Sequence, residues 1–146
     1  DSVRLDLFGV VFDQRIEKSV WQVVTALVEG HLTLGRRVIL DSTALTRKRR
    51  EPWIELARKY GVDAVSIFVN PPLEAVLQRN RLRPGDWIVP EDVILEKASY
   101  LEPPRIEEGF SSTIEIGGAD DDYDTVRRFL ESFVAAVDDA TRDRVS

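Results

Sequence analysis

Two short segments of this chain carry residue types suited to handling phosphate. In residues 38–50 (VILDSTALTRKRR), an apolar run leads into Asp41 and Thr43 and then into four consecutive cations. In residues 77–93 (LQRNRLRPGDWIVPEDV), Arg79 and Arg83 stand four positions apart, just before a Pro-Gly pair. Open α/β sheets bind their ligands at the carboxyl ends of parallel strands. The two segments therefore predict a phosphate-binding site and a phosphoryl-transfer function.

Asp41 and Thr43 flank the turn that follows the first apolar run. A carboxylate at this place can orient a water bound to magnesium or a nearby hydroxyl, and Thr43 can hydrogen-bond an acceptor substrate. We therefore place both residues in a substrate-binding site. A purely structural alternative is an Asx-type turn in which Thr46 caps the next helix.

Four cations, Arg47 to Arg50, open the helix expected over residues 48–60. Cations at a helix N-terminus oppose the helix dipole and cost a few tenths of a kcal/mol each. A polyanion bound at this end would offset that cost, so we predict that Arg47 and Arg50 bind an anionic substrate. The alternative is a set of solvated side chains at a loop edge.

Arg79 and Arg83 share one helical face if the helix expected over residues 73–81 continues past its end. Two guanidinium groups at this spacing can hold neighbouring phosphate oxygens and neutralise charge that moves during phosphoryl transfer. Pro84 and Gly85 supply a hinge directly afterwards. The alternative is an ordinary exposed helix end, with Asp86 pairing one of the arginines.

The expected elements alternate between helix and strand, which predicts a parallel sheet with helices on both faces. Three strands are few for so much helix, so we expect that one or two strands of the sheet are not in the chain as given. The expected helices span residues 14–33, 48–60, 73–81, 90–101 and 126 onward, and the expected strands span residues 38–40, 64–69 and 112–116.

Composition narrows the function further. The 146 residues, 43% hydrophobic, suit one domain, and the absence of cysteine with a single histidine argues against disulfides and zinc. No apolar run approaches the roughly 18 residues of a membrane span, so a cytoplasmic protein is expected. The net charge of −6 hides a basic stretch at residues 36–60, with eight cations against three anions. This distribution fits a polyanionic ligand.

The motifs, taken in order, resemble the polynucleotide 5′-hydroxyl kinase branch of the P-loop kinases, a group with zeta-toxin-like and other small AAA-type phosphotransferases. Individually they are weak, but their order and spacing are specific up to Ile116. They are Asp1 and Arg4 followed by LFG at residues 7–9, DST at 41–43, RNRLR at 79–83, VPEDVI at 89–94, EPP at 102–104 and EGF at 108–110.

The resemblance implies a three-layer P-loop NTPase-type parallel sheet with helices on both faces, in a single domain over residues 1–146 with a lid at 79–101. It implies ATP and Mg²⁺ as cofactors and a nucleic-acid 5′ end as partner. Asp1 would accept the proton from the attacking hydroxyl, and Arg4 would contact a substrate phosphate beside it. Thr43 would help to seat the acceptor. Arg79 and Arg83 would clamp the nucleotide.

Two departures from the family pattern qualify this interpretation. Ala44 stands where many relatives carry Asn, which affects the acceptor site, and no G-x-x-x-x-G-K-[ST] phosphate loop occurs in the sequence. In the family that loop follows a central strand, between those expected at residues 38–40 and 64–69, so we expect strand and loop upstream of Asp1. The alternative functions are a small-molecule kinase and a degenerate domain that binds nucleic acid or another partner without catalysis.

Overall fold

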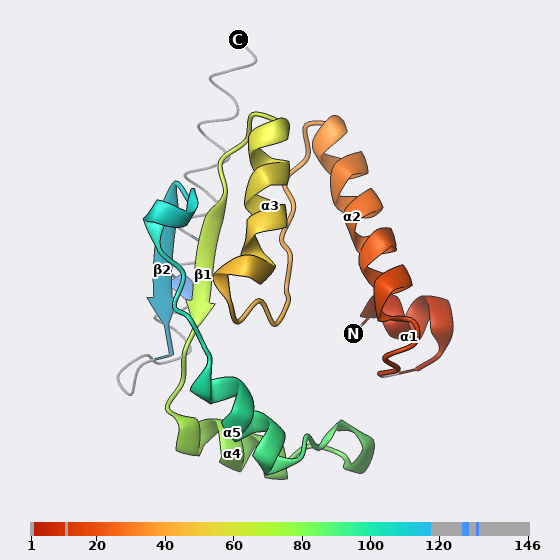
Figure 1. The fold of residues 1–146 in the computed structure, drawn as a ribbon, viewed down its shortest axis with the longest axis vertical. Coiled ribbons are helices and arrows are strands. Elements are labelled where there is room, and N and C mark those ends of the chain that lie inside the picture. Colours follow the sequence, from red (N-terminus) through yellow and green to blue (C-terminus); the bar gives the residue numbers. More distant parts are fainter. Residues whose placement is uncertain (1, 11, 118–126, 129–130, 132–146) are drawn as a thin grey trace.

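The computed structural model describes residues 2–10, 12–117, 127–128 and 131. Among these residues, three α-helices precede β1, and two more α-helices separate β1 from β2 (Figure 1). The helix predicted from residue 126 lies outside the described residues, apart from positions 127, 128 and 131. The elements are α1 (Ser2–Phe8), α2 (Glu17–Thr33), α3 (Arg47–Lys59), β1 (Val65–Val69), α4 (Leu73–Arg81), a 3₁₀ turn (Gly85–Trp87), α5 (Glu91–Ser99), a second 3₁₀ turn (Ile106–Glu108) and β2 (Ser112–Ile116).

The two described strands form a parallel pair, with Val65 opposite Ser112 and Val69 opposite Ile116. The prediction of β2 over residues 112–116 is confirmed at both ends, and β1 begins one residue later than predicted. The crossover between them carries α4 and α5, as a parallel connection requires. The fold is therefore of the α/β class, and the described residues contribute two strands to its sheet.

The third predicted strand, Val38–Leu40, is wrong as a hydrogen-bonded strand. The segment is extended, and its side chains alternate, because Val38 and Leu40 are half-buried while Ile39 is 91% exposed. This alternation is that of a strand. No backbone hydrogen bond joins the segment to another element within the described residues, so the ladder that would define a strand does not form.

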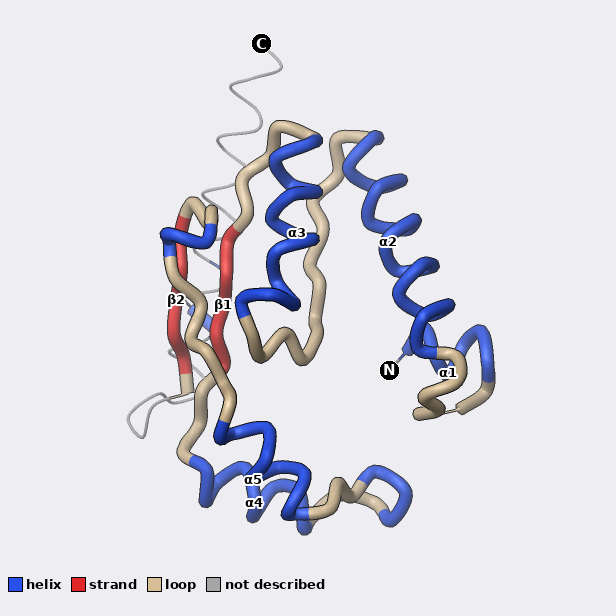
Figure 2. Tube along the Cα trace, in the orientation of Figure 1, coloured by secondary structure: helices blue, strands red, loops and turns tan. Residues whose placement is uncertain are grey.

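Helix α3 packs beside β1, and α2 lies on the far side of α3 (Figures 1 and 2). Trp21 of α2 and Trp53 of α3 join the two helices, with ring centroids 6.0 Å apart at an interplanar angle of 52°. The most buried apolar side chains among the described residues come from the same two helices: Val20, Ile54 and Leu56. Gly61 ends α3 as predicted, with a φ of 65° that favours glycine.

Helix α4 and helix α5, which lies within the predicted lid at residues 79–101, are found beyond the carboxyl ends of β1 and β2, and the N-terminus of α3 points to the same edge (Figure 1). The turn at residues 41–46 lies at this edge too, just before α3 (Figure 2). Most of the segments with predicted chemistry are therefore gathered at one edge of the molecule. No helix within the described residues combines the length and the apolar character needed to cross a bilayer.

Candidate functional site

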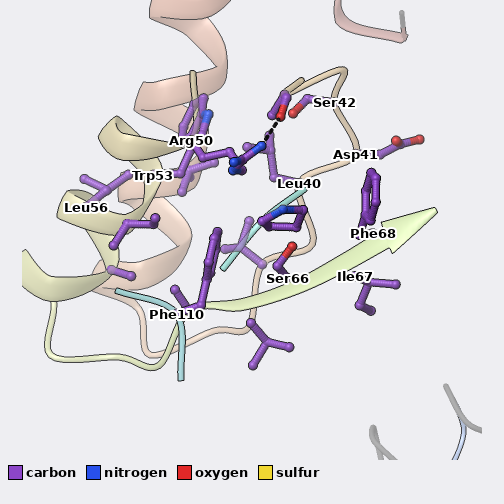
Figure 3. A pocket seen from close by; sticks show the side chains of 18 of the residues that line it. Leu40, Asp41, Ser42, Arg50, Trp53, Leu56, Ser66, Ile67, Phe68 and Phe110 are labelled. Carbon is purple, nitrogen blue, oxygen red and sulfur yellow. Dashed lines mark hydrogen bonds between the residues drawn. The ribbon is translucent and has the colours of Figure 1, made fainter. Parts of the chain in front are cut away.

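A cavity of about 480 Å³ separates β1 from the extended segment at residues 38–45. Its walls are mostly apolar and come from α2, α3, β1 and Phe110. Asp41, Ser42 and Thr43 also line it, and Asp41 lies near the carboxyl end of β1 (Figure 3). Native cores leave few voids larger than a water molecule. This cavity opens to solvent and is large enough to admit a ligand or a further segment of chain.

Two backbone edges that have no hydrogen-bond partner among the described residues face this cavity. Ala64 accepts a hydrogen bond from Ser111 N–H at 2.8 Å, and Asn70 N–H donates to the Ile116 carbonyl at 2.7 Å. Because backbone groups alternate along a strand, the N–H and C=O groups of residues 65, 67 and 69 point to the opposite edge, away from β2. Residues 38–40, across the cavity, also lack backbone hydrogen bonds within the described part of the chain.

The turn at residues 41–46 is held by Arg50, a buried side chain at the start of α3 (Figure 3). Its Nε and Nη2 donate to the two carboxylate oxygens of Glu108, each at 2.7 Å. Its Nη1 donates to the carbonyls of Ala44 at 3.0 Å and Glu102 at 2.8 Å. The hydrogen bonds from Arg50 hold the pKa of the Glu108 carboxyl below its ordinary value, against the opposing effect of burial.

The prediction that Arg50 binds substrate is corrected by this geometry. The guanidinium is committed to Glu108 and to two main-chain carbonyls, and the side chains of the ion pair are 8% and 5% exposed. A substrate anion would have to displace a buried carboxylate to reach it. The sequence placed Glu108 in a motif, but nothing in the local pattern showed that it meets a cation 58 positions earlier.

Helix α3 is capped by a distant carboxylate. Glu102 Oε2 accepts a hydrogen bond from Arg47 N–H at 2.7 Å, and Glu102 N–H donates to the Leu45 carbonyl at 2.9 Å. The Thr46 side chain makes no capping bond, so the structural alternative for this turn is wrong in that detail. The protein thus supplies its own anion at the positive end of this helix dipole.

Three of the four cations at this helix start remain available. The side chains of Arg47, Lys48 and Arg49 are exposed, and none forms an ion pair with another described residue. They lie next in sequence to the turn that holds Asp41 and Thr43, both also exposed. The structure therefore brings Arg47, Asp41 and Thr43 to one edge, where their substrate-binding roles remain predictions.

The structure places Arg4 elsewhere. Helix α1 lies near the N-terminal end of α2, apart from β1 (Figure 1). There Arg4 forms a fork with Glu17, with Nη2 donating to Oε2 at 2.7 Å, and this contact lowers the pKa of the Glu17 carboxyl. The guanidinium also lies 6.0 Å from the centre of the Phe12 ring. Its predicted contact with a substrate phosphate would compete with Glu17, and Asp1 lies outside the described residues.

The lid presents Arg79 and Arg83 differently from the prediction. Helix α4 ends at Arg81, so Arg83 follows the helix rather than sharing a face of it with Arg79. The condition for a shared face, a helix that continues to Arg83, is therefore not met, although Arg83 N–H still donates to the Asn80 carbonyl at 3.1 Å in a final turn. Both guanidinium groups are exposed and form no ion pair within the described residues, whereas Arg81 between them pairs with Glu91 at 2.6 Å.

Asn80 is a residue whose role the sequence argument missed. It is 3% exposed, and its side-chain amide is bonded to the main chain of Val89 in both directions. A signal was present, because Asn80 follows Leu73, Val76 and Leu77 on the apolar stripe of α4, at positions i+7, i+4 and i+3. A polar residue on such a stripe predicts a buried and satisfied amide.

The described residues do not by themselves form a metal site, since no group of three or more His, Asp or Glu side chains is placed to hold an ion. Mg²⁺ in nucleotide enzymes needs only one or two carboxylates together with substrate phosphates. Asp41 is the carboxylate at the appropriate edge. One carboxylate at this edge is compatible with an Mg²⁺ ion that is bound together with a phosphate ligand.

A comparison with protein families finds a match over the first part of the chain. The family model for the AAA domain matches residues 1–104, more than two thirds of the chain. The matched part includes the extended segment at residues 38–45 and helices α3, α4 and α5. It ends at Pro104, before the 3₁₀ turn that carries Glu108.

Proposed function

Because this chain belongs to the AAA domain family, whose fold is of the P-loop NTPase type, we propose that it moves the γ-phosphate of ATP to the 5′-hydroxyl of a polynucleotide. Family membership indicates nucleotide binding and a kinase-like activity. The transfer reaction and its acceptor are the parts that we propose.

The observation that carries the proposal is the pair of unpaired guanidinium groups on the lid. Arg79 and Arg83 are exposed and free of ion pairs among the described residues, while Arg81 is neutralised by Glu91. Surface arginines without a function gain a little from any nearby carboxylate. Two unpaired arginines on a segment that lies beyond the carboxyl ends of β1 and β2 suit the charge on transferring phosphate oxygens, which arginine stabilises in phosphoryl transfer.

The acceptor side of the proposal depends on the start of α3. Arg47, Lys48 and Arg49 are exposed next to the turn that carries Asp41 and Thr43. A polynucleotide has a phosphate at each following nucleotide, so a row of cations beside the hydroxyl-binding turn would hold it by its backbone. A small neutral acceptor would gain little from this row.

The proposal places the phosphate loop on a strand that fills the cavity. Such a strand would pair with the free edge of β1 at residues 65, 67 and 69 and with residues 38–40 on its other side. Each backbone hydrogen bond of such a ladder contributes about 0.5 to 1.5 kcal/mol net, which a small ligand in an apolar cavity would not supply. A parallel strand would also end at the edge where Asp41 and the lid lie, and would deliver its loop there.

The residues of this chain would act on the reaction as follows. Thr43 and Asp41 would hydrogen-bond and orient the attacking hydroxyl, which loses its proton to a carboxylate late, once the bond to phosphorus is forming. Asp1 is the proposed acceptor of that proton. Arg79 and Arg83 would stabilise the charge that shifts toward the leaving oxygen. Mg²⁺, when bound with the nucleotide, would neutralise phosphate oxygens.

The test is transfer of labelled γ-phosphate by the full-length protein to an oligonucleotide with a 5′-hydroxyl, against the same oligonucleotide with a 5′-phosphate. We expect label on the first alone. Replacing Arg47, Lys48 and Arg49 together by Gln should raise the KM for the oligonucleotide at least about tenfold, because phosphate contacts dominate affinity. Label on a small-molecule hydroxyl, with no effect of this triple variant, would favour a small-molecule kinase instead. ATP binding without transfer to any acceptor would favour a non-catalytic domain.

A further inference from the structure

The side chain of Asn80 is a buried amide, and its hydrogen bonds hold the loop that follows helix α4. Asn80 and Arg50 are the two polar side chains in the buried class among the described residues. Burying a side-chain amide costs free energy unless its donors and acceptor are bonded. The position would accept an apolar side chain on the stripe of α4, so packing alone does not explain an amide there.

The amide of Asn80 bonds both main-chain groups of a single residue. Its Nδ2 donates to the Val89 carbonyl at 2.7 Å, and Val89 N–H donates to Oδ1 at 2.9 Å. The side chain therefore pairs with Val89 much as a neighbouring strand would. Aspartate lacks the donor for this pairing, and glutamine is one methylene longer.

The main chain of Asn80 holds the other end of the same loop. Its carbonyl accepts a hydrogen bond from Arg83 N–H at 3.1 Å. Between these two anchors, Trp87 N–H donates to the Pro84 carbonyl at 2.8 Å and Ile88 N–H to the Gly85 carbonyl at 3.1 Å. Both ends of the loop at residues 82–88 are therefore hydrogen-bonded to Asn80, and two further backbone hydrogen bonds lie within the loop.

Arg83 is carried by this closed loop, whereas Arg79 is carried by helix α4 itself. Arg83 is exposed and forms no ion pair with any described residue, so among these residues it is the backbone of the loop that sets where its side chain starts. The outer pair of Arg81 with Glu91 is 61% and 45% exposed and adds little, as exposed pairs do.

We propose that Asn80 is a positioning residue that sets the direction in which Arg83 meets a nucleotide phosphate. The proposal rests on the proposed function in that Arg83 contacts the phosphate. Asn80 itself touches no substrate. Arg79 is held by helix α4 and not by the loop, so the position of its guanidinium should not depend on the Asn80 side chain.

The first arm of the test is amide hydrogen exchange, which needs no activity. In the wild-type chain the Val89 amide should be protected, and in Asn80→Ala it should exchange at least about tenfold faster. Asn80→Asp keeps the acceptor for Val89 N–H and should lie between the two. Gln78→Ala, an exposed position on the same helix, is the matched control and should leave Val89 unchanged. An unchanged exchange rate of the Val89 amide in Asn80→Ala would show that the Asn80 side chain does not hold the loop, and would overturn the proposal.

The second arm is a double-mutant cycle on kcat for ATP turnover. A misplaced catalytic group can cost on the order of 100-fold, so Asn80→Ala should lower kcat by about 10- to 100-fold. Because the loss acts through Arg83, adding Asn80→Ala to Arg83→Ala should change kcat by less than about twofold. Adding Asn80→Ala to Arg79→Ala should lower kcat by the same 10- to 100-fold as in the wild-type background. Equal losses in both backgrounds would show a general structural effect and overturn the positioning role.

The two arms separate this proposal from the proposed function. A wild-type chain that neither binds nor turns over ATP refutes the proposed function and removes the positioning role of Asn80, whatever the exchange arm shows. Normal turnover in Asn80→Ala, together with a deprotected Val89 amide, leaves the kinase assignment standing and overturns the positioning role alone.

Discussion

The buried pair of Arg50 and Glu108 makes the sharpest prediction about stability. Replacing Arg50 by Ala leaves the Glu108 carboxylate buried without its partner and removes the donors that satisfy the carbonyls of Ala44 and Glu102. Removing one member of a buried ion pair costs about 3 to 5 kcal/mol. A small domain has about 5 to 15 kcal/mol of stability in total, so the variant should be severely destabilised.

The control for this prediction is the exposed pair of Arg81 and Glu91, whose side chains are 61% and 45% exposed. Arg81→Ala should cost between 0 and about 1 kcal/mol. Urea unfolding followed by tryptophan fluorescence measures both, because Trp53 lies on the same helix as Arg50. Arg50→Lys keeps the positive charge but cannot donate two parallel hydrogen bonds to Glu108, so its loss of unfolding free energy should lie between those of Arg50→Ala and Arg81→Ala. It is the variant to measure if Arg50→Ala does not fold. Equal losses in Arg50→Ala and Arg81→Ala would refute the reasoning.

Two further predictions concern the same edge of the molecule. Since Arg50 lowers the pKa of Glu108 in the folded chain, the pair's contribution to stability is complete above the ordinary carboxyl pKa of about 4.3 and is lost as pH falls through the lowered value. The unfolding free energy of Glu108→Gln should therefore fall less than that of the wild type between pH 7 and 3; identical losses would contradict this. Glu102→Ala removes the cap of α3 and should cost about 1 kcal/mol, measured by urea unfolding, with the exposed Glu96→Ala as control. A loss no larger than that of the control would show that Glu102 does not cap the helix.

Local patterns predicted most of the described elements, because each depends on neighbours in sequence. The apolar stripe of α3 and the glycine after it place that helix within about one residue, and the run from Ser112 to Ile116 defines β2. The segment at Val38–Leu40 has the same local pattern as a strand, yet it forms no ladder. A strand is completed by a partner, and no such partner lies beside it among the described residues.

The site was predictable in its location but not in its long-range contacts. The edge that carries Asp41, Thr43 and the cations of α3 followed from the order of elements. The commitment of Arg50 to Glu108 did not, because the two residues are 58 positions apart and neither motif indicates the other. Asn80 could have been found, since it interrupts the apolar stripe of its own helix.

The central claim is that the guanidinium of Arg83 stabilises phosphate charge during transfer from ATP. The most direct measurement is the single-turnover rate of labelled γ-phosphate transfer by full-length wild-type protein and by Arg83→Ala, at saturating ATP and oligonucleotide, with Gln78→Ala as control. An arginine in this role is worth about 10³- to 10⁵-fold in rate, so the account predicts a loss approaching that range with the fold intact. A rate within about threefold of wild type in Arg83→Ala would contradict it.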